Sequence, residues 1–396
     1  MKQNRKIPSP DLETIMPLLI GAWRRLLKIS GPSETLQTRE FREVVAQVQI
    51  LQARSDKGQS LSGQDYFKDP HLLGAYLLYD WVLHYQQGLS LIGELPEPPK
   101  RVLDICSGAA PFAFAALRHG AEEVIATDLN ASALQLGAEV CGRYGLPLTV
   151  RKWNCLQDSL PLDGQFDLII LGHCLDDLFP SSQKGWMESQ KTFLNHLFSL
   201  LTPKGQILIV DSSLNEMNRR ILMLRDALVQ EGIPVQAPCV WRGECPALKA
   251  NSQCYAQREL VKPQLIKDIQ RSASINLSSL KMSYLILRNP ASGWPDVGNQ
   301  PLYRVISPPI DTFSGKRFYL CGTDGKKQLG SHLDKHPIES RAFEYLKRGE
   351  LISVTGALEK QNALDIIQGT TVRAVAACGK PLPSTTAEEN KASDTI

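Results

Sequence analysis

The sequence lacks the features that mark membrane, secreted and strongly nucleic-acid-binding proteins. No apolar run reaches the roughly 18 residues of a membrane-spanning helix, and the N-terminus MKQNRKIPSPDLETIMPLL has no apolar segment of the secretory type. Its Asp11 and Glu13 are also atypical of a transit peptide. The net charge of +3 over 396 residues is too small to indicate nucleic-acid binding by itself. We therefore expect a cytoplasmic monomer that has no contact with a membrane.

Paired cysteines and a glycine-rich dinucleotide motif are also missing. The nine cysteines are an odd number spread along a long chain, which is a poor match to a disulfide scaffold and suits a reducing compartment. None of them forms the Cys-x2-Cys pair of a zinc ribbon. No GxGxxG motif is present, and this argues against a dinucleotide that is bound through its pyrophosphate.

The spacing of apolar residues changes along the chain and indicates four regions. Residues 1–98 are expected to form an N-terminal helical region, because residues 11–54 and 69–95 have helical spacing. Residues 99–290 alternate strands with helices, which predicts a parallel sheet of the α/β class with both faces covered. Residues 300–380 contain short strands between Gly and Pro turns and predict a small, barrel-like β unit similar to an OB-fold. The polar tail, residues 381–396, is expected to be disordered.

The stretch RVLDICSGAAPFAFAAL, residues 101–117, predicts the ligand-binding end of the sheet. It reads as an apolar strand, a turn of small residues and an alanine-rich helix, which places backbone N–H groups at the carboxyl end of a strand. Asp128 closes the second strand 24 residues after Asp104, where a carboxylate can bind the hydroxyls of a ribose. With Asn154 after the third strand, this pattern resembles the Rossmann-like fold of class I S-adenosylmethionine-dependent methyltransferases.

That resemblance implies a site for S-adenosylmethionine. In the family the first acid, here Asp104, helps to place the methionine amine, and the second acid, here Asp128, binds the ribose. The residues expected at the cofactor are Asp104, Ser107, Gly108, Asp128, Asn154 and Cys155. The alternative for Asp104 is a structural role as a cap at the end of its strand.

Two residues of the turn depart from the methyltransferase pattern. Cys106 and Ala110 stand where glycines are common, which predicts a narrower approach to the cofactor and weaker binding. After the fourth strand comes LGHCLDDLF, a position at which methyltransferases place groups that face the substrate. His173 and Asp176 are therefore the candidate catalytic residues, with a structural histidine as the alternative for His173. The sequence has no Asn-Pro-Pro-Tyr signature of amino methylation.

A group of cysteines is the most specific feature of the sequence. Cys239, Cys245 and Cys254 lie within 16 residues, and Cys321 in the segment FYLCGTDGK is the best candidate for a fourth ligand. Thiolates are soft ligands that suit zinc or an iron–sulfur cluster. The unpaired spacing and the Cys245-Pro246 step favour a cluster over zinc, and reduced cysteines without a metal are the third alternative.

The order of these segments resembles a narrower family. Over roughly residues 65–375, the order of segments resembles that of the methyltransferase-like small-ribosomal-subunit assembly factors, whose members include mitochondrial and bacterial proteins. The segments are, in order, the HLLGAYLLY helix, the turn after residue 101, LGHCLDDLFP, the cysteine group, SYLILRN, YRVISPP and YLCGTDG. This resemblance implies a [4Fe-4S] cluster held by Cys239, Cys245, Cys254 and Cys321. It also implies association with the small ribosomal subunit or its rRNA, and it leaves catalysis open.

The C-terminal β unit carries many cations, which a solvated surface or a contact with an RNA backbone would both explain. They are Arg304, Lys316, Arg317, Lys326, Lys327, Lys335, Arg341, Lys347 and Arg348. The predicted function is that of a methyltransferase-like, iron–sulfur-binding factor in small-subunit assembly or translation. The alternatives are a catalytically inactive RNA-binding scaffold and a zinc-bound methyltransferase of a small molecule or a protein.

Overall fold

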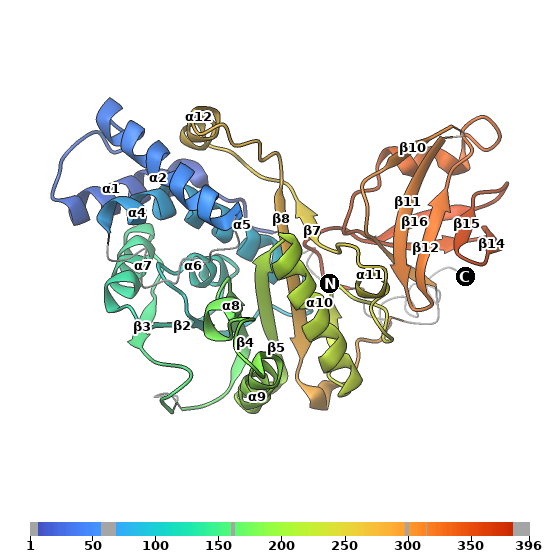
Figure 1. Cartoon of the computed structure of the whole chain (residues 1–396), viewed down its shortest axis with the longest axis horizontal. Helices are drawn as coiled ribbons and strands as arrows, with labels where there is room; N and C mark the ends of the chain where they lie inside the picture. The colour runs from blue at the N-terminus through green and yellow to red at the C-terminus, as the bar shows by residue number, and fades with distance from the viewer. Residues whose placement is uncertain (1–6, 57–68, 160–162, 298–300, 314, 383–396) are drawn as a thin grey trace, which may run out of the picture.

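The computed structural model describes residues 7–56, 69–159, 163–297, 301–313 and 315–382. A helical part, a large sheet covered by helices, and a second sheet follow one another along the chain (Figure 1). Of the C-terminal tail expected to be disordered, residues 383–396 lie outside the described residues. Within the described ranges, no helix is long and apolar enough to cross a membrane.

The N-terminal part consists of helices that pack on the large sheet. They are α1 (Leu12–Leu27), α2 (Thr38–Asp56), α4 (Pro70–Ala75), the π-helix η1 (Tyr76–Asp80) and α5 (Trp81–Ile92). The residues 11–54, predicted to be helical, form the two helices α1 and α2, because the chain turns between Leu27 and Thr38, where Gly31 and Pro32 interrupt the pattern. The segment α4–η1–α5 is nearly continuous, and π-helical turns are frequent at functional sites.

The large sheet has the strand order β3-β2-β1-β4-β5-β8-β6, and β7 pairs with β8. Strands β1 to β5 are parallel, whereas β8 is antiparallel to β5. This is the Rossmann-like sheet of a class I methyltransferase, as predicted. Its strands are β1 (Arg101–Ile105), β2 (Glu123–Asp128), β3 (Thr149–Lys152), β4 (Phe166–Gly172), β5 (Leu201–Ser212), β6 (Val235–Ala237), β7 (Ala256–Arg258) and β8 (Leu280–Arg288).

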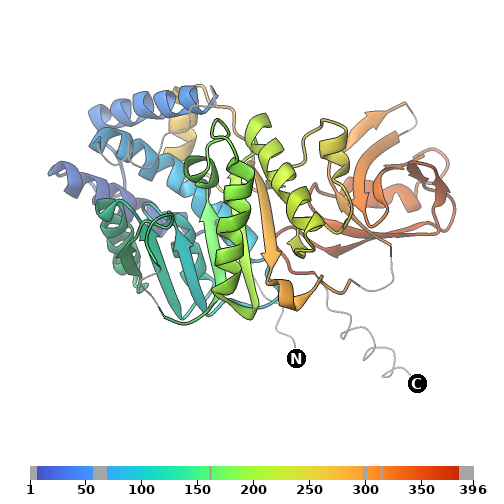
Figure 2. The ribbon, with the colours of Figure 1, turned by 60° about the horizontal axis from the view of Figure 1, so that its bottom comes forward.

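Two apolar cores cover the two faces of this sheet. In β4, Leu168 and Ile170 point into one core, and Ile169 and Leu171 point into the other, because successive strand side chains alternate between faces. The first core also contains residues of α1, α2 and α5, so the N-terminal helices share their apolar interior with the sheet. The helices of the sheet part are α6 (Pro111–Arg118), α7 (Ala131–Tyr144), α8 (Leu175–Leu178), α9 (Trp186–Ser199), α10 (Asn215–Gln230), α11 (Pro246–Lys249) and α12 (Gln264–Ser272), and α9 and α10 lie in front of the sheet in Figure 2.

The C-terminal part is a curled sheet of the half-barrel type with its own core. Its strand order is β14-β15-β12-β11-β9-β13-β16, with β10 paired to β11. Phe318, Leu320, Leu329 and Ile352 fill its interior together with Phe343 from the 3-10 helix η3 (Glu339–Glu344). The strands are β9 (Leu302–Val305), β10 (Ile310–Thr312), β11 (Gly315–Gly322), β12 (Gly325–Gly330), β13 (Leu351–Thr355), β14 (Leu358–Lys360), β15 (Ala363–Asp365) and β16 (Thr371–Ala376).

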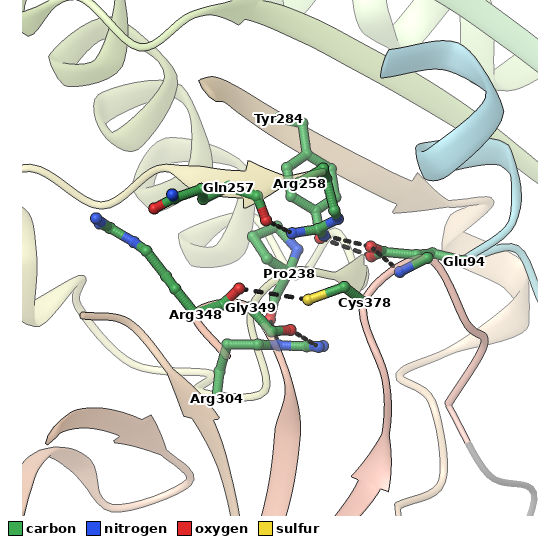
Figure 3. A network of polar contacts seen from close by, with 10 residues as sticks. Glu94, Pro238, Gln257, Arg258, Tyr284, Arg304, Arg348, Gly349 and Cys378 are labelled. Carbon is green, nitrogen blue, oxygen red and sulfur yellow. Dashed lines mark hydrogen bonds and ion pairs between the residues drawn. The ribbon is translucent and has the colours of Figure 1, made fainter. Parts of the chain in front are cut away.

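A buried polar network joins these three parts (Figure 3). The Arg258 guanidinium of β7 forms an ion pair with Glu94, which follows α5, and both side chains are 4% exposed. The Tyr284 hydroxyl of β8 donates a hydrogen bond of 2.6 Å to Glu94 Oε2. From the segment after β16, the Gly379 N–H donates to Glu94 Oε1 over 3.2 Å. One carboxylate therefore holds donors from the large sheet and from the C-terminal part.

Removing that carboxylate should destabilise the whole protein. In Glu94→Ala the Arg258 charge stays buried without a partner, which typically costs about 3–5 kcal/mol. We expect a loss of this size in the free energy of unfolding, measured by urea denaturation. The matched control is Glu97→Ala, because Glu97 pairs with Lys204 on the surface and exposed pairs contribute little. Equal stability of the two variants would contradict a joining role for Glu94.

Candidate functional site

The turn after β1 adopts a conformation that favours glycine. Cys106, Gly108 and Ala110 all have positive φ angles, of 55°, 54° and 62°. For a residue with a side chain, this left-handed conformation costs about 1–2 kcal/mol. Two hydrogen bonds hold the turn on β2, because the Ser107 N–H donates to Thr127 O over 3.0 Å and the Gly108 N–H donates to Asp128 Oδ2 over 2.9 Å. Asp128, which is predicted to bind the ribose, therefore also holds the turn in its conformation.

Neighbouring helices hold the turn and make room for Ala110. The Trp81 indole of α5 donates to Ala109 O over 2.8 Å, which ties the turn to the N-terminal helices. A methyl group added at Gly137 of α7 would lie 2.8 Å from Ala110 Cβ and 2.9 Å from the Ala109 carbonyl. The alanine in the turn thus fits because α7 carries a glycine opposite it.

This turn opens onto a pocket of about 600 Å³, a size typical of ligand sites. The structure brings together all eight residues predicted for the cofactor and catalytic sites. These are Asp104, Ser107, Gly108, Asp128, Asn154, Cys155, His173 and Asp176. A wall formed by η1 and α5 was not predicted from the sequence, and in it Tyr76, Asp80, His84 and Gln87 line the same pocket. Their spacing of three or four residues places them on one helix face, which is the only sequence signal that could have indicated this wall.

Asp104 is buried at the carboxyl end of β1. Its Oδ2 accepts a hydrogen bond of 3.0 Å from the Ala113 N–H of α6, whereas Oδ1 has no hydrogen-bond partner among the described residues. Burial raises the pKa of Asp104 to about 8. A buried carboxyl oxygen without a partner is costly and indicates a ligand that donates a hydrogen bond to it. An ammonium group at this point would also favour the ionised carboxylate.

Asp128, Asn154 and Cys155 line the pocket beside Asp104. Asp128 Oδ1 accepts from the Asn130 N–H over 2.8 Å, and burial raises the pKa of Asp128. Asn154 Oδ1 accepts from the Leu156 N–H over 3.2 Å, so this side chain also shapes its own loop. Cys155 and Cys106 both line the pocket and are partly exposed, so Cys106 lies at the border of the pocket rather than in the core.

His173 lies at the carboxyl end of β4 in a dense polar arrangement. Its Nε2 lies 2.8 Å from Gln87 Oε1 of α5, and its Nδ1 lies 4.0 Å from Asp211 Oδ1 of β5. The His173 ring stacks on His84, with ring centroids 4.1 Å apart. Burial lowers the pKa of His173 to about 4, and that of His84 falls for the same reason and because of the neighbouring imidazole. Both rings are therefore neutral at pH 7.

Asp176 lines the pocket but already has a cationic partner. Arg220 of α10 forms an ion pair with Asp176 and donates to Phe179 O over 2.6 Å. The Arg220 guanidinium also lies over the Trp186 ring, 4.4 Å from its centroid. These contacts favour a role for Asp176 in fixing α8 against α10.

The four cysteines predicted as metal ligands line one cavity of about 50 Å³ between the two sheets. Cys239, Cys245 and Cys254 come from the segment between β6 and β7, and Cys321 comes from β11 of the C-terminal part. Helix α10 fixes this segment, because Asp226 accepts from the Cys245 N–H over 3.0 Å and Asn218 Oδ1 accepts from the Cys254 N–H over 3.1 Å.

The donor set of this cavity suits a soft, anionic centre. Four thiols are the ligand set of an iron–sulfur cluster or of a structural zinc ion. Arg225, which is 1% exposed, lies beside them, and the charges of Cys239 and Cys245 contribute to its raised pKa. In the part of the chain that the structure describes, its Nε has no hydrogen-bond partner. Within the described residues, no three His, Cys, Asp or Glu side chains stand in an arrangement that could hold a metal ion as they are.

The basic residues of the C-terminal part are not all on the surface. Arg304 is buried and donates to Pro238 O over 3.0 Å and to Gly349 O over 2.9 Å (Figure 3). Lys327 is buried and pairs with Asp324 and Glu359, and Lys347 pairs with Glu259 over 2.8 Å. Arg304 and Lys327 therefore serve internal contacts, whereas the Lys347–Glu259 pair lies on the surface.

Comparisons with known proteins show similarity to curated relatives, to solved structures and to one family model. The ribosomal protein L11 methyltransferase of Lactobacillus delbrueckii subsp. bulgaricus is 28% identical over 158 residues, which are 38% of this chain and 49% of that protein. The chain thus spans about half the length of the curated relatives that it matches.

Solved structures include a ribosomal protein L11 methylase from the same organism, at 17% identity and a TM-score of 0.30, which covers 52% of this chain and 75% of that one. The N-methyltransferase NodS from Bradyrhizobium japonicum WM9 has 16% identity and a TM-score of 0.33, with 52% and 94% covered. The model of the family described as mitochondrial small ribosomal subunit Rsm22 matches residues 94–336. This match covers more than half of the sequence, and the chain therefore belongs to the mitochondrial small ribosomal subunit Rsm22 family.

Proposed function

We propose that this chain is a methyltransferase-like factor that binds S-adenosylmethionine and a [4Fe-4S] cluster and acts in assembly or translation on the small ribosomal subunit. One observation carries the cofactor part of the proposal. Asp104 Oδ1 is buried and finds no hydrogen-bond partner in the described ranges, and Asp104 lines a pocket at the carboxyl ends of parallel strands, where nucleotide-like ligands bind. Membership of the Rsm22 family supports the link to the small subunit.

The residues of the pocket fit the cofactor. Asp104 would accept from the methionine ammonium, and Asp128 would accept from the ribose hydroxyls. The turn at Ser107 and Gly108 would lie against the cofactor, and Asn154 with Cys155 would border the adenine. When bound, S-adenosylmethionine supplies an activated methyl group. The protein contributes the positioning of the reacting groups, because the neutral His173, held by Gln87, can orient an acceptor group in line with that methyl.

The cysteine cavity supports the second part of the proposal. Cys239, Cys245, Cys254 and Cys321 would hold the cluster, and they would thereby fasten β11 to the methyltransferase sheet. The buried Arg225 would balance part of its negative charge. Zinc on the same thiols is the alternative, and metal analysis distinguishes the two.

A scaffold without catalysis is the second candidate function. The pairing of Asp176 with Arg220 favours it, since this removes one of the two candidate catalytic groups from the reaction. In this case the cofactor pocket and the cluster fix the shape of a surface that binds the small subunit.

Cofactor affinity should depend on Asp128. Asp128→Ala removes the proposed ribose acceptor and the bond to the Gly108 N–H. Hydrogen bonds to charged groups contribute about 1.5–3 kcal/mol, so we expect at least about tenfold weaker binding of S-adenosylhomocysteine by calorimetry. Asp163→Ala, an exposed acid outside the pocket, is the control. Unchanged affinity in Asp128→Ala would argue against this binding mode.

Metal content should depend on the four cysteines. Protein purified without oxygen should contain about four iron and four sulfide per chain, and Cys245→Ser should lose both. Cys378→Ser is the control, because Cys378 lies outside the cavity and a serine can keep its contact with Arg348 O. Zinc, or no metal, in the wild-type protein would refute the cluster.

Association with the small subunit separates the two candidate functions. We expect sedimentation with small-subunit precursors to survive Asp128→Ala and to fail with Cys245→Ser, because the cysteines join the sheets and the cofactor does not. Transfer of a labelled methyl group that is lost in Asp128→Ala would support the enzyme. Loss of sedimentation in Asp128→Ala would contradict the scaffold.

A further inference from the structure

Helix α10 places an arginine in the wall of the cysteine cavity. Arg225 is 1% exposed and lines this cavity together with Cys239, Cys245, Cys254 and Cys321. It lies inside the helix rather than at an end, so the helical hydrogen bonds fix its backbone. The side chain therefore reaches the cavity from a rigid support.

Two of the three guanidinium nitrogens hold the loop that precedes Cys245. Arg225 Nη2 donates to Trp241 O, and Nη1 donates to Gly243 O. Nη1 also donates to Asp226 Oδ1 over 2.6 Å, and the Asp226 carboxylate accepts from the Cys245 N–H over 3.0 Å. These bonds fasten the loop to α10 and fix the orientation of the guanidinium.

The third nitrogen, Nε, is left without an acceptor. It is buried, and within the described ranges it has no hydrogen-bond partner. The guanidinium is planar, so Nε cannot turn to another acceptor unless the Nη bonds to the loop break. A buried donor without an acceptor is costly, which indicates a ligand or a water molecule beside it.

The charge of Arg225 acts on all four thiols of the cavity. Burial by itself lowers the pKa of Arg225, but the charges of Cys239 and Cys245 contribute to a net rise. Burial raises the pKa of Cys254 and of Cys321, and the Arg225 charge opposes that rise. The guanidinium is therefore near the whole group of thiols and not only near one of them.

Two further arginines line the cavity, but each serves another contact. Arg258, whose Nε also lacks a partner among the described residues, forms its ion pair with Glu94. Arg304 donates to two backbone carbonyl oxygens, one of them that of Pro238. Arg225 is thus the arginine best placed to contact a centre that the thiols hold.

We propose that Arg225 sets the reduction potential of the centre bound by the four cysteines, because its Nε donates a hydrogen bond to one of the sulfur atoms. This inference rests on the proposed [4Fe-4S] cluster. Hydrogen bonds to the sulfur atoms are among the features that set the potential of such a cluster. The reduced form carries one more negative charge, so a donor stabilises it and raises the potential.

The test compares Arg225→Lys with the wild-type holoprotein, both purified without oxygen. Lysine keeps the positive charge, but its single nitrogen cannot hold the loop and donate to the centre in the same geometry. Arg219→Lys is the matched control, because Arg219 lies on the same helix, is exposed, bonds to Asn251 and does not line the cavity.

Two measurements are made on each protein. Reductive titration followed by visible absorption gives the midpoint potential of the cluster. Pulsed EPR of the reduced protein, labelled with nitrogen-15 at arginine, detects a nitrogen that is hydrogen-bonded to the cluster. Neither readout would change if Arg225 only supported the fold of the loop.

We expect Arg225→Lys to keep its iron and sulfide and to shift the ratio of oxidised to reduced cluster tenfold toward the oxidised form. This corresponds to a midpoint potential about 59 mV lower for a one-electron couple. The wild type should show a nitrogen-15 coupling that Arg225→Lys lacks, and Arg219→Lys should match the wild type in both measurements.

An unchanged potential in Arg225→Lys, or no nitrogen-15 coupling in the wild type, would overturn the assignment and place a water molecule at Nε instead. If Arg225→Lys does not keep its cluster, the coupling in the wild type decides alone. Zinc, or no metal, in the wild-type protein would overturn the proposed cluster on which the inference rests.

Discussion

The buried carboxylate of Glu94 is the constraint on which the arrangement of the three parts depends. It stands between the end of α5 and two sheets, and it accepts hydrogen bonds from Arg258, Tyr284 and the Gly379 N–H. Because Arg258 is buried with it, neither charge can be removed alone without leaving the other uncompensated. The position of α5 follows from this contact, and α5 in turn supplies Trp81 to the cofactor turn and Gln87 to His173.

Helix α10 connects the two candidate sites. Met217 of α10 lines the cofactor pocket, and Arg220 pairs with Asp176 of the same pocket. On the same helix, Arg225 lines the cysteine cavity, and Asn218 Oδ1 accepts from the Cys254 N–H. A rigid helix with contacts on both sides places the sites at a fixed separation. The cysteine cavity is thus part of the same framework as the cofactor pocket, even though Cys321 comes from the C-terminal sheet.

Those parts of the fold and of the cofactor pocket that depend on local sequence patterns could be predicted from the sequence. The alternation of strands and helices predicts the parallel sheet, and the acids at the ends of two strands predict the positions of Asp104 and Asp128 in one pocket. Cys321 lines one cavity with three cysteines that lie at least 67 residues earlier in the sequence. This was predicted from the positions of the cysteines and from the family resemblance, because periodicity carries no information about such distant contacts. Asp80 and His84 were missed because a helix face can be buried against a core or line a pocket, and only tertiary packing distinguishes the two. The same limit applies to Arg304 and Lys327, whose burial depends on partners from other strands.

The left-handed backbone at Cys106 and Ala110 explains why the glycine-poor turn does not abolish the pocket. Both residues adopt the conformation that glycine would take, and Gly137 opposite Ala110 leaves space for the alanine side chain. The most direct test of the cofactor site is a crystal structure of the protein with S-adenosylhomocysteine. It should place the amino group of the ligand within hydrogen-bond distance of Asp104 Oδ1 and its ribose at Asp128. A ligand bound elsewhere, with Asp104 Oδ1 still unpartnered, would contradict the account.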